Sequence, residues 1–329
     1  MDAQTLLKRW FLQRIVRSSK AGGFTLLEIL VSLVIASIVV VGLLYLVVEM
    51  MQLNRRETVL NEVQTDMRQA LDYINRDARE AVFVYSTPTA VTGELDDLPT
   101  VGTPPVPATP ILAFWRPDPV DVTNIGNGNG DCEDDGFTAA QVNECEILQI
   151  RQSAYTLVVY LQTPNNDDSS IWQGQSRIIR YELPKYRNLG NLTQTPGYQD
   201  PVAKGVDFET WTPTATNTDG NAAVLTDYID APDTDISGFT LPGCPSTTGY
   251  VRTPGTEAAG NSFFVCARDT GPDPSDEDYE GRQNQDLLVF LRGDALDGSR
   301  GLGRSILSDR SSLPTLKSEI LVRGVLDER

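Results

Sequence analysis

An uninterrupted run of apolar residues lies near the start of the chain, at residues 29–48. These 20 residues carry no charged side chain. As a helix with a rise of about 1.5 Å per residue, the run would span the roughly 30 Å hydrocarbon layer of a bilayer. The pattern therefore predicts one transmembrane helix, which begins near Phe24.

Beyond this run the pattern becomes amphipathic, and no Gly or Pro occurs between Leu43 and Thr87 to stop the helix. Apolar residues recur at steps of three and four, as on one face of a helix. They are Leu60, Val63, Met67, Leu71, Ile74, Ala78 and Val82. Charged residues between them, Asp72, Arg76 and Asp77 among them, are expected on the opposite, water-facing side. We therefore expect a single helix over residues 24–84, about 90 Å long.

After Thr87 the chain changes to short β-type runs separated by polar, Gly- and Pro-rich stretches. Such runs, rich in Val, Ile, Tyr and Phe, are typical of half-buried strands. We expect strands at residues 111–115, 147–150, 155–161, 177–183, 262–267, 286–291 and 319–325. The stretches at 118–136, 186–207 and 212–221 are long for structureless loops in a compact domain. The expected fold class is α+β, with an antiparallel β-sheet domain and long loops.

The composition narrows the possible functions. The chain has no histidine, which excludes Ser-His-Asp and Cys-His catalysis and His-ligated zinc or haem. Residues 1–23 hold five bases and one acid, so the remainder of the 27 bases and 45 acids leaves 22 against 44, a net charge of -22. A body of that charge is repelled by nucleic acid, so no nucleic-acid partner is expected. The 44 acids make any single carboxylate pair uninformative, and we do not expect an enzyme.

The basic residues before the apolar run predict its orientation. They are Lys8, Arg9, Arg14, Arg17 and Lys20, whereas the flank that follows the run is balanced in charge. Positive flanks stay in the cytoplasm, so the N-terminus is expected there and the body on the far side. An ordinary signal peptide has an apolar core of about 7–15 residues and a small-residue cleavage site after it, and neither feature is present.

The junction between the basic leader and the apolar run carries a specific motif. Lys20-Ala-Gly-Gly23 is followed by Phe24-Thr-Leu-Leu-Glu28. This segment resembles the prepilin-type cleavage and methylation signal of the type IV pilin and type II secretion pseudopilin family. The resemblance implies that a prepilin peptidase cuts between Gly23 and Phe24 and then methylates the new amine of Phe24.

Glu28 has a physical reading of its own. An acid inside an apolar helix costs up to about 2.5–3.5 kcal/mol at the helix centre, less near an end, and usually has a partner. The resemblance implies that this partner is the charged amine of Phe24 in a neighbouring subunit, which exists only after cleavage. The alternative is that the helix macrodipole alone stabilises Glu28 near the helix N-terminus.

The layout implied by the resemblance is a pilin-like fold, with a long N-terminal helix packed on a β-sheet domain. It divides the chain into a cleaved leader at 1–23, a transmembrane half-helix at 24–48, an amphipathic half-helix at 49–84 and an exported body at 85–329. The expected location is the inner membrane, crossed once, with the body in the periplasm. Implied partners are the prepilin peptidase, major and minor pilins or pseudopilins, and an inner-membrane assembly platform.

Within the family, residues 67–81 and the large body resemble minor subunits, and the acidic loops resemble pseudopilins of hormogonium polysaccharide secretion. We therefore expect a minor pseudopilin in a filament that supports secretion. The alternatives are a minor type IV pilin that acts as a surface or glycan adhesin, and a membrane-anchored enzyme that carries the same signal. Trp115, Trp172 and Trp211 could stack on sugars, although core packing is the commoner role of such residues.

Four cysteines lie in the expected exported part, where oxidation is favoured. The sequence leaves three pairings open, and the local pairs Cys132–Cys145 and Cys244–Cys266 would each close a loop. A four-thiolate zinc site would need closer pairs of cysteines. We expect disulfides.

The acidic loops raise the question of calcium, which binds oxygen ligands. Residues 127–135 resemble the start of an EF-hand loop, but Cys132 replaces its glycine and Thr138 its bidentate glutamate. Asp273, Asp276 and Asp278 form a second, weak calcium candidate. Solvated charge is the better explanation of both clusters, so no cofactor is expected.

Overall fold

The computed structural model describes residues 23–101, 106–133, 136–165, 171–172, 174–215, 217–232, 243–245, 249–255, 262–268, 285–294 and 315–322. The chain divides into two compact units, residues 1–57 and residues 58–329. The leader at 1–22 and the calcium candidates Asp273, Asp276 and Asp278 lie outside the described residues.

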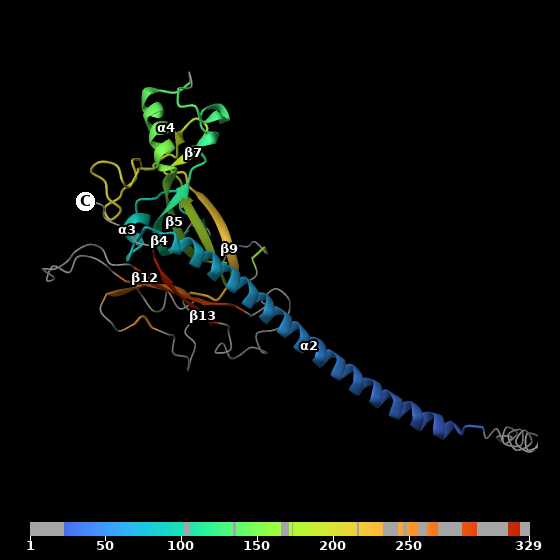
Figure 1. The fold of residues 1–329 in the computed structure, drawn as a ribbon. Coiled ribbons are helices and arrows are strands. Elements are labelled where there is room, and N and C mark those ends of the chain that lie inside the picture. The colour runs from blue at the N-terminus through green and yellow to red at the C-terminus, as the bar shows by residue number, and fades with distance from the viewer. Residues whose placement is uncertain are drawn as a thin grey trace, which may run out of the picture. The chain divides into compact units, whose positions relative to one another are not determined.

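One helix, α2 (Leu26–Arg79), contains both halves of the expected pilin helix (Figure 1). It ends at Arg79, short of the predicted end near Val84. The reason is pairing, because the Val82 N–H donates to the Trp115 carbonyl at 2.8 Å and Phe83–Val84 form strand β1. Val82 stood at helical spacing, but the Val-Phe-Val sequence also favours a strand, and a sheet edge is available to it.

In the described part of the body there are two larger antiparallel sheets rather than one, together with the two-stranded pairs β2-β3 and β7-β8. The five-stranded sheet has the order β1-β4-β5-β6-β9 and the four-stranded sheet the order β10-β11-β12-β13. The strands of the first after β1 are β4 (Thr109–Pro119), β5 (Ser153–Pro164), β6 (Ser176–Leu183) and β9 (Asn221–Ile229). Those of the second are β10 (Tyr250–Thr253), β11 (Phe263–Arg268), β12 (Asp286–Arg292) and β13 (Thr315–Leu321). The long N-terminal apolar helix and the antiparallel sheets confirm the predicted α+β class.

Smaller elements connect these strands (Figure 1). They are α3 (Thr89–Thr92), β2 (Thr100–Val101), β3 (Val106–Pro107), η1 (Val122–Asn124), η2 (Gly126–Gly130), α4 (Ala139–Arg151), β7 (Tyr186–Asn188) and β8 (Thr193–Gln194). The prediction of a strand at residues 147–150 was wrong, because these residues belong to helix α4. The helix is started by a capping box in which Thr138 and Gln141 bond each other's backbone N–H groups.

The five-stranded sheet has a core on each face. Successive side chains of a strand point to opposite sides, and in β5 both sets are buried. In β5, Val158 and Tyr160 belong to one core, and Leu157, Val159 and Leu161 to the other. The first core joins this sheet to the four-stranded sheet and to the second half of α2. Its residues from α2 are Val63, Met67, Leu71, Ile74 and Ala78, the apolar stripe that the sequence predicted.

The second core is covered by the stretch between β8 and β9, most of which the sequence predicts as loop. Its aromatic side chains Tyr198, Phe208 and Trp211 are buried against Trp115 of β4. The Trp211 indole N–H donates to the Gln199 carbonyl at 2.7 Å, and the Tyr198 hydroxyl donates to the Tyr155 carbonyl at 2.6 Å. This stretch is therefore an anchored cover for the sheet.

Candidate functional site

Two parts of α2 carry the features that bear on function. The first is its N-terminus with the apolar half, in the unit formed by residues 1–57. The second is its outer half, which packs on the sheets within the unit formed by residues 58–329. The first part is apolar around the helix, whereas the second carries an apolar stripe on one side.

Thr25 starts the helix at the motif junction. Its carbonyl accepts hydrogen bonds from the N–H groups of Glu28 at 3.0 Å and Ile29 at 3.2 Å, and its hydroxyl oxygen accepts from the Glu28 N–H at 3.3 Å. Thr25 thus acts as an N-cap, satisfying N–H groups that the first turn leaves without helical partners. Glu28 lies in this first turn, where the positive end of the helix dipole also favours an acid.

Nothing in the described part of the chain uses the side chain of Glu28 or the lack of one at Gly23. Both residues are exposed, and no described side chain or backbone group bonds the Glu28 carboxylate. A methyl group added at Gly23 would meet no described atom within 4 Å. Apart from the helix dipole at Glu28, no contact in the described part of the chain requires a glycine at 23 or an acid at 28.

The apolar half of α2 presents hydrophobic side chains around its whole circumference. Leu26, Ile29, Val34, Ile38 and Leu44 are all exposed, as are their apolar neighbours. This segment is long and apolar enough to cross a membrane, by length and composition. A helix that is hydrophobic all round is expected to be covered by lipid or by other helices.

The two serines within this half bond to backbone carbonyls of the same helix. The Ser32 hydroxyl donates to the Glu28 carbonyl at 2.6 Å, and the Ser37 hydroxyl donates to the Val34 carbonyl at 2.7 Å. Back-bonding of this kind leaves no free hydroxyl donor in an apolar environment. Residues 29–48 contain no acid and no base, and Glu28 directly precedes them.

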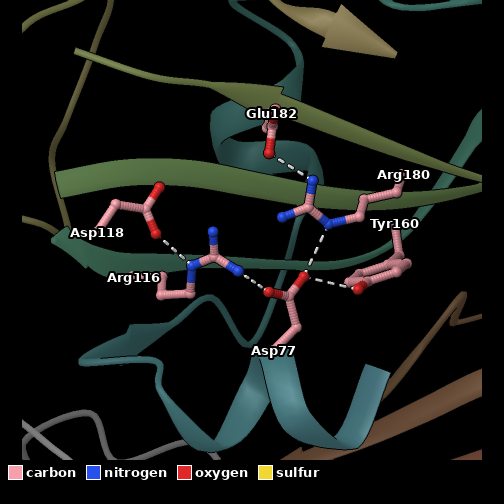
Figure 2. A network of polar contacts seen from close by, with 6 residues as sticks. All are labelled: Asp77, Arg116, Asp118, Tyr160, Arg180 and Glu182. Carbon is pink, nitrogen blue, oxygen red and sulfur yellow. Dashed lines mark hydrogen bonds and ion pairs between the residues drawn. The ribbon is translucent and has the colours of Figure 1, made fainter. Parts of the chain in front are cut away.

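In the outer half of α2, the buried residue Asp77 ties the helix to the five-stranded sheet (Figure 2). Its side chain accepts hydrogen bonds from Tyr160 of β5 at 2.7 Å and from Arg180 Nε of β6 at 2.8 Å. Arg116 of β4 donates to the second carboxylate oxygen through Nη1. Three consecutive strands of the sheet therefore bind one carboxylate of the helix.

Further acids complete this network. The Arg116 Nε donates to Asp118 at 2.6 Å, and Arg180 Nη1 donates to Glu182 (Figure 2). Both guanidinium groups are largely buried, so each charge has an opposite charge and a hydrogen bond where water is scarce. The sequence analysis placed Asp77 on the water-facing side of the helix, which was wrong: Asp77 is 4% exposed.

Two groups of this network, Tyr160 and Arg180, keep their protons at ordinary pH. Burial and the negative charge of Asp77 both raise the pKa of Tyr160, so the phenol stays a donor. Burial disfavours the charged form of Arg180, but hydrogen bonds to Asp77 and Glu182 outweigh it and the pKa of Arg180 is raised. Both groups therefore remain hydrogen-bond donors to Asp77.

The predicted disulfide pairs are both formed. Cys132 and Cys145 join the η2 region to α4 with a Cα–Cα distance of 5.5 Å. Cys244 and Cys266 join a loop to β11 with a Cα–Cα distance of 5.6 Å. Since all four cysteines are paired, none of them is a zinc ligand.

The other sequence-predicted candidates are placed as follows. Trp115 and Trp211 lie in the core, with 0% and 2% of their surface exposed, so neither offers a sugar-stacking face. Trp172 is half-buried, and the guanidinium of Arg177 lies 4.6 Å from the centre of its ring. Among the residues that the structure describes, no group of three or more His, Cys, Asp or Glu side chains is arranged to hold a metal ion.

The N-terminal end of α2 is capped and exposed, and its apolar half is long enough to cross a membrane. Residues 18–44 match the family described as the prokaryotic N-terminal methylation motif. The match covers Gly23, Phe24 and Glu28 and supports the type IV pilin and pseudopilin family. It implies processing by a prepilin peptidase and assembly with pilins, and it points to a structural protein. No curated protein and no solved structure matches the chain.

Proposed function

We propose that the chain is a minor pseudopilin: it is cut between Gly23 and Phe24, methylated at Phe24, and built through α2 into a short filament that supports secretion. The observation that carries this proposal is the methylation motif at residues 18–44, joined directly to a fully apolar half-helix. In this account the cut creates the amine that Glu28 of an incoming subunit needs.

The geometry of the motif supports this order of events. Gly23 has open space around it among the described residues, so a peptidase can reach the bond to Phe24. Glu28 lies one turn from Phe24, with its carboxylate unbonded in the described chain. An ionised acid in hydrocarbon costs several kcal/mol unless it is paired, and pairing with a neighbour's amine removes that cost. Assembly is thereby tied to prior processing.

The proposed location is the inner membrane, with the leader in the cytoplasm and the body in the periplasm. The basic residues before α2 support this orientation, as do the two disulfides, which form in oxidising compartments. An inner-membrane assembly platform and neighbouring pseudopilins are the proposed partners. The large acidic body supports the role of a minor subunit in the filament. The likeness of the acidic loops to those of hormogonium pseudopilins extends the proposal to polysaccharide as the secreted cargo.

The test measures cleavage after Gly23 and incorporation into the filament separately. In cells that make the whole apparatus, Glu28→Leu is expected to be processed normally but to be lost from the filament fraction, because the neighbour's amine has no acid to meet. Glu49→Leu is the matched control, since Glu49 is an exposed acid of the same helix beyond the apolar run. Normal incorporation and secretion by Glu28→Leu would overturn the proposed role of this residue.

A further inference from the structure

Helix α4 has an apolar outer face that the described chain does not cover. Ala139, Ala140, Ile147 and Ile150 are all exposed, and Ile150 keeps 85% of its surface open to solvent. At 100° per residue these four positions fall on one side of the helix, with the exposed Asn143 between them, opposite the buried Cys145 and Leu148. We call this set the α4 outer face.

Among the described residues of the body, the other exposed large apolar side chains do not form such a face. Tyr73, Ile171, Val202, Val224 and Leu321 each come from a different helix, strand or loop. Single exposed apolar residues are normal on a protein surface, whereas neighbouring ones with a common direction indicate an interaction site.

The α4 outer face is held rigidly in place. The Cys132–Cys145 disulfide fixes the inner side of the helix, and the capping box at Thr138 fixes its start. Glu144 accepts a hydrogen bond from Tyr186 and pairs with Lys185 at 2.6 Å. A preformed surface loses little conformational entropy on binding, so this bracing favours recognition by a partner.

Charge decides which kind of partner fits. Residues 120–151, which contain α4 and the loop joined to it, hold seven acids and one base. The exposed acid Glu146 borders the face on the helix itself. A second copy of this body would be repelled by the like charge, as would an anionic lipid surface. The complementary surface has apolar side chains at its centre and Lys or Arg around them.

We propose that the α4 outer face is a docking surface for another protein, one whose contact surface is apolar at its centre and basic at its rim. This goes beyond the proposed function, which concerns α2 and its N-terminal motif. The isoleucines supply the buried centre of the interface, and the acids select for a basic partner and steer its approach.

Site-specific photo-crosslinking of the full chain, in cells that make the whole apparatus, tests the proposal. The photoreactive residue p-benzoylphenylalanine replaces Ile150 in one strain and Ile171, which is 70% exposed, in the control strain. The expected product from position 150 is one discrete protein adduct, whose cross-linked peptide contains an excess of Lys and Arg. Position 171 is expected to give no such adduct.

Two added substitutions test the chemistry of the contact. Glu146→Lys and Ile147→Ser are each expected to reduce the adduct at least about tenfold, the scale of a central interface residue. Both side chains are exposed, so the fold and the Cys132–Cys145 disulfide should be kept. Cleavage at Gly23 and incorporation are scored in the same cells, which separates a lost partner from failed assembly.

The proposal is overturned if position 150 gives no protein adduct, or gives an adduct with lipid or with a second copy of this chain. It is also overturned if position 171 captures the same protein to the same extent, or if both added substitutions leave the adduct unchanged.

Discussion

The side chain of Gln285 bonds both backbone groups of Val84. Its Oε1 accepts from the Val84 N–H at 2.8 Å, and its Nε2 donates to the Val84 carbonyl at 2.9 Å. Val84 lies in β1 of the five-stranded sheet, and Gln285 directly precedes β12 of the four-stranded sheet. A side-chain amide thus takes the place of a neighbouring strand and links the two sheets at the point where α2 has just ended.

Gln285→Ala is expected to lower the free energy of unfolding by about 2–4 kcal/mol, because two buried backbone groups of Val84 lose their partners. The measurement is denaturant unfolding of the detergent-solubilised full chain, followed by tryptophan fluorescence, since Trp115 and Trp211 are buried. Gln149→Ala is the control, because Gln149 is exposed and its side chain donates to the Gly130 carbonyl at 3.0 Å. Equal effects of the two substitutions would contradict the linking role of Gln285.

Asp77→Ala is expected to destabilise the body by about 3–5 kcal/mol, because Arg116 and Arg180 would keep buried charges without their shared partner. Replacement of Asp72, an exposed acid on the same helix, should change stability by less than about 0.5 kcal/mol. The same unfolding measurement compares the two. A small effect at Asp77 would mean that apolar packing alone holds α2 to the sheet.

The raised pKa of Asp66 predicts how the stability of the body changes with pH. Burial raises its pKa above the ordinary value of 3.8, and the charges of Glu62 and Asp227 raise it further. The folded chain therefore binds this proton more tightly than the unfolded chain, and the stability contributed by this group falls as the pH rises through its pKa. At pH 7 the ionised carboxylate is a cost, so Asp66→Asn should stabilise the body there, within about 1 kcal/mol because the site is partly solvated.

The gain from Asp66→Asn should shrink as the pH is lowered, and it should vanish below 3.8, where Asp66 is protonated in both states. Thermal unfolding of both proteins from pH 3 to pH 8 measures this. A gain that is the same at every pH would show that the charges of Glu62 and Asp227 are not its cause.

The Cys132–Cys145 disulfide is expected to hold α4 and the loop before it as one local unit. The bridge closes a loop with a sequence separation of 13, worth about 3 kcal/mol in the chain-entropy account. In the double variant Cys132→Ser, Cys145→Ser, trypsin should cut after Arg151, at the end of α4, faster than in the parent chain. The variant that removes Cys244 and Cys266 should leave this cut unchanged, and faster cutting in both would indicate a global effect.

The sequence predicted those parts of the fold whose signals are local. The apolar stripe from Val63 to Ala78 could be read from its spacing, because a helix that packs on one side repeats every three or four residues. The short spacing within each cysteine pair suggested the pairs that form. Such signals depend on neighbours along the chain.

The parts that the sequence did not predict depend on distant segments. Ile147 and Ile150 resembled a strand because a short apolar run fits either structure, and the capping box at Thr138 was the overlooked signal for a helix. Asp77 resembled a surface acid because its partners Arg116, Tyr160 and Arg180 lie up to 103 residues away. Strand β9 was missed because its first residues, Asn221 and Ala222, carry little β-type character.

The central claim is that a peptidase cuts this chain between Gly23 and Phe24, and mass spectrometry of the mature N-terminus tests it most directly. The chain is isolated from membranes of cells with the prepilin peptidase and of cells without it. The account predicts an N-terminal peptide that begins with methylated Phe24 in the first case and with the intact leader in the second. A mature protein that keeps Met1 when the peptidase is present, or that begins at another residue, would contradict the account.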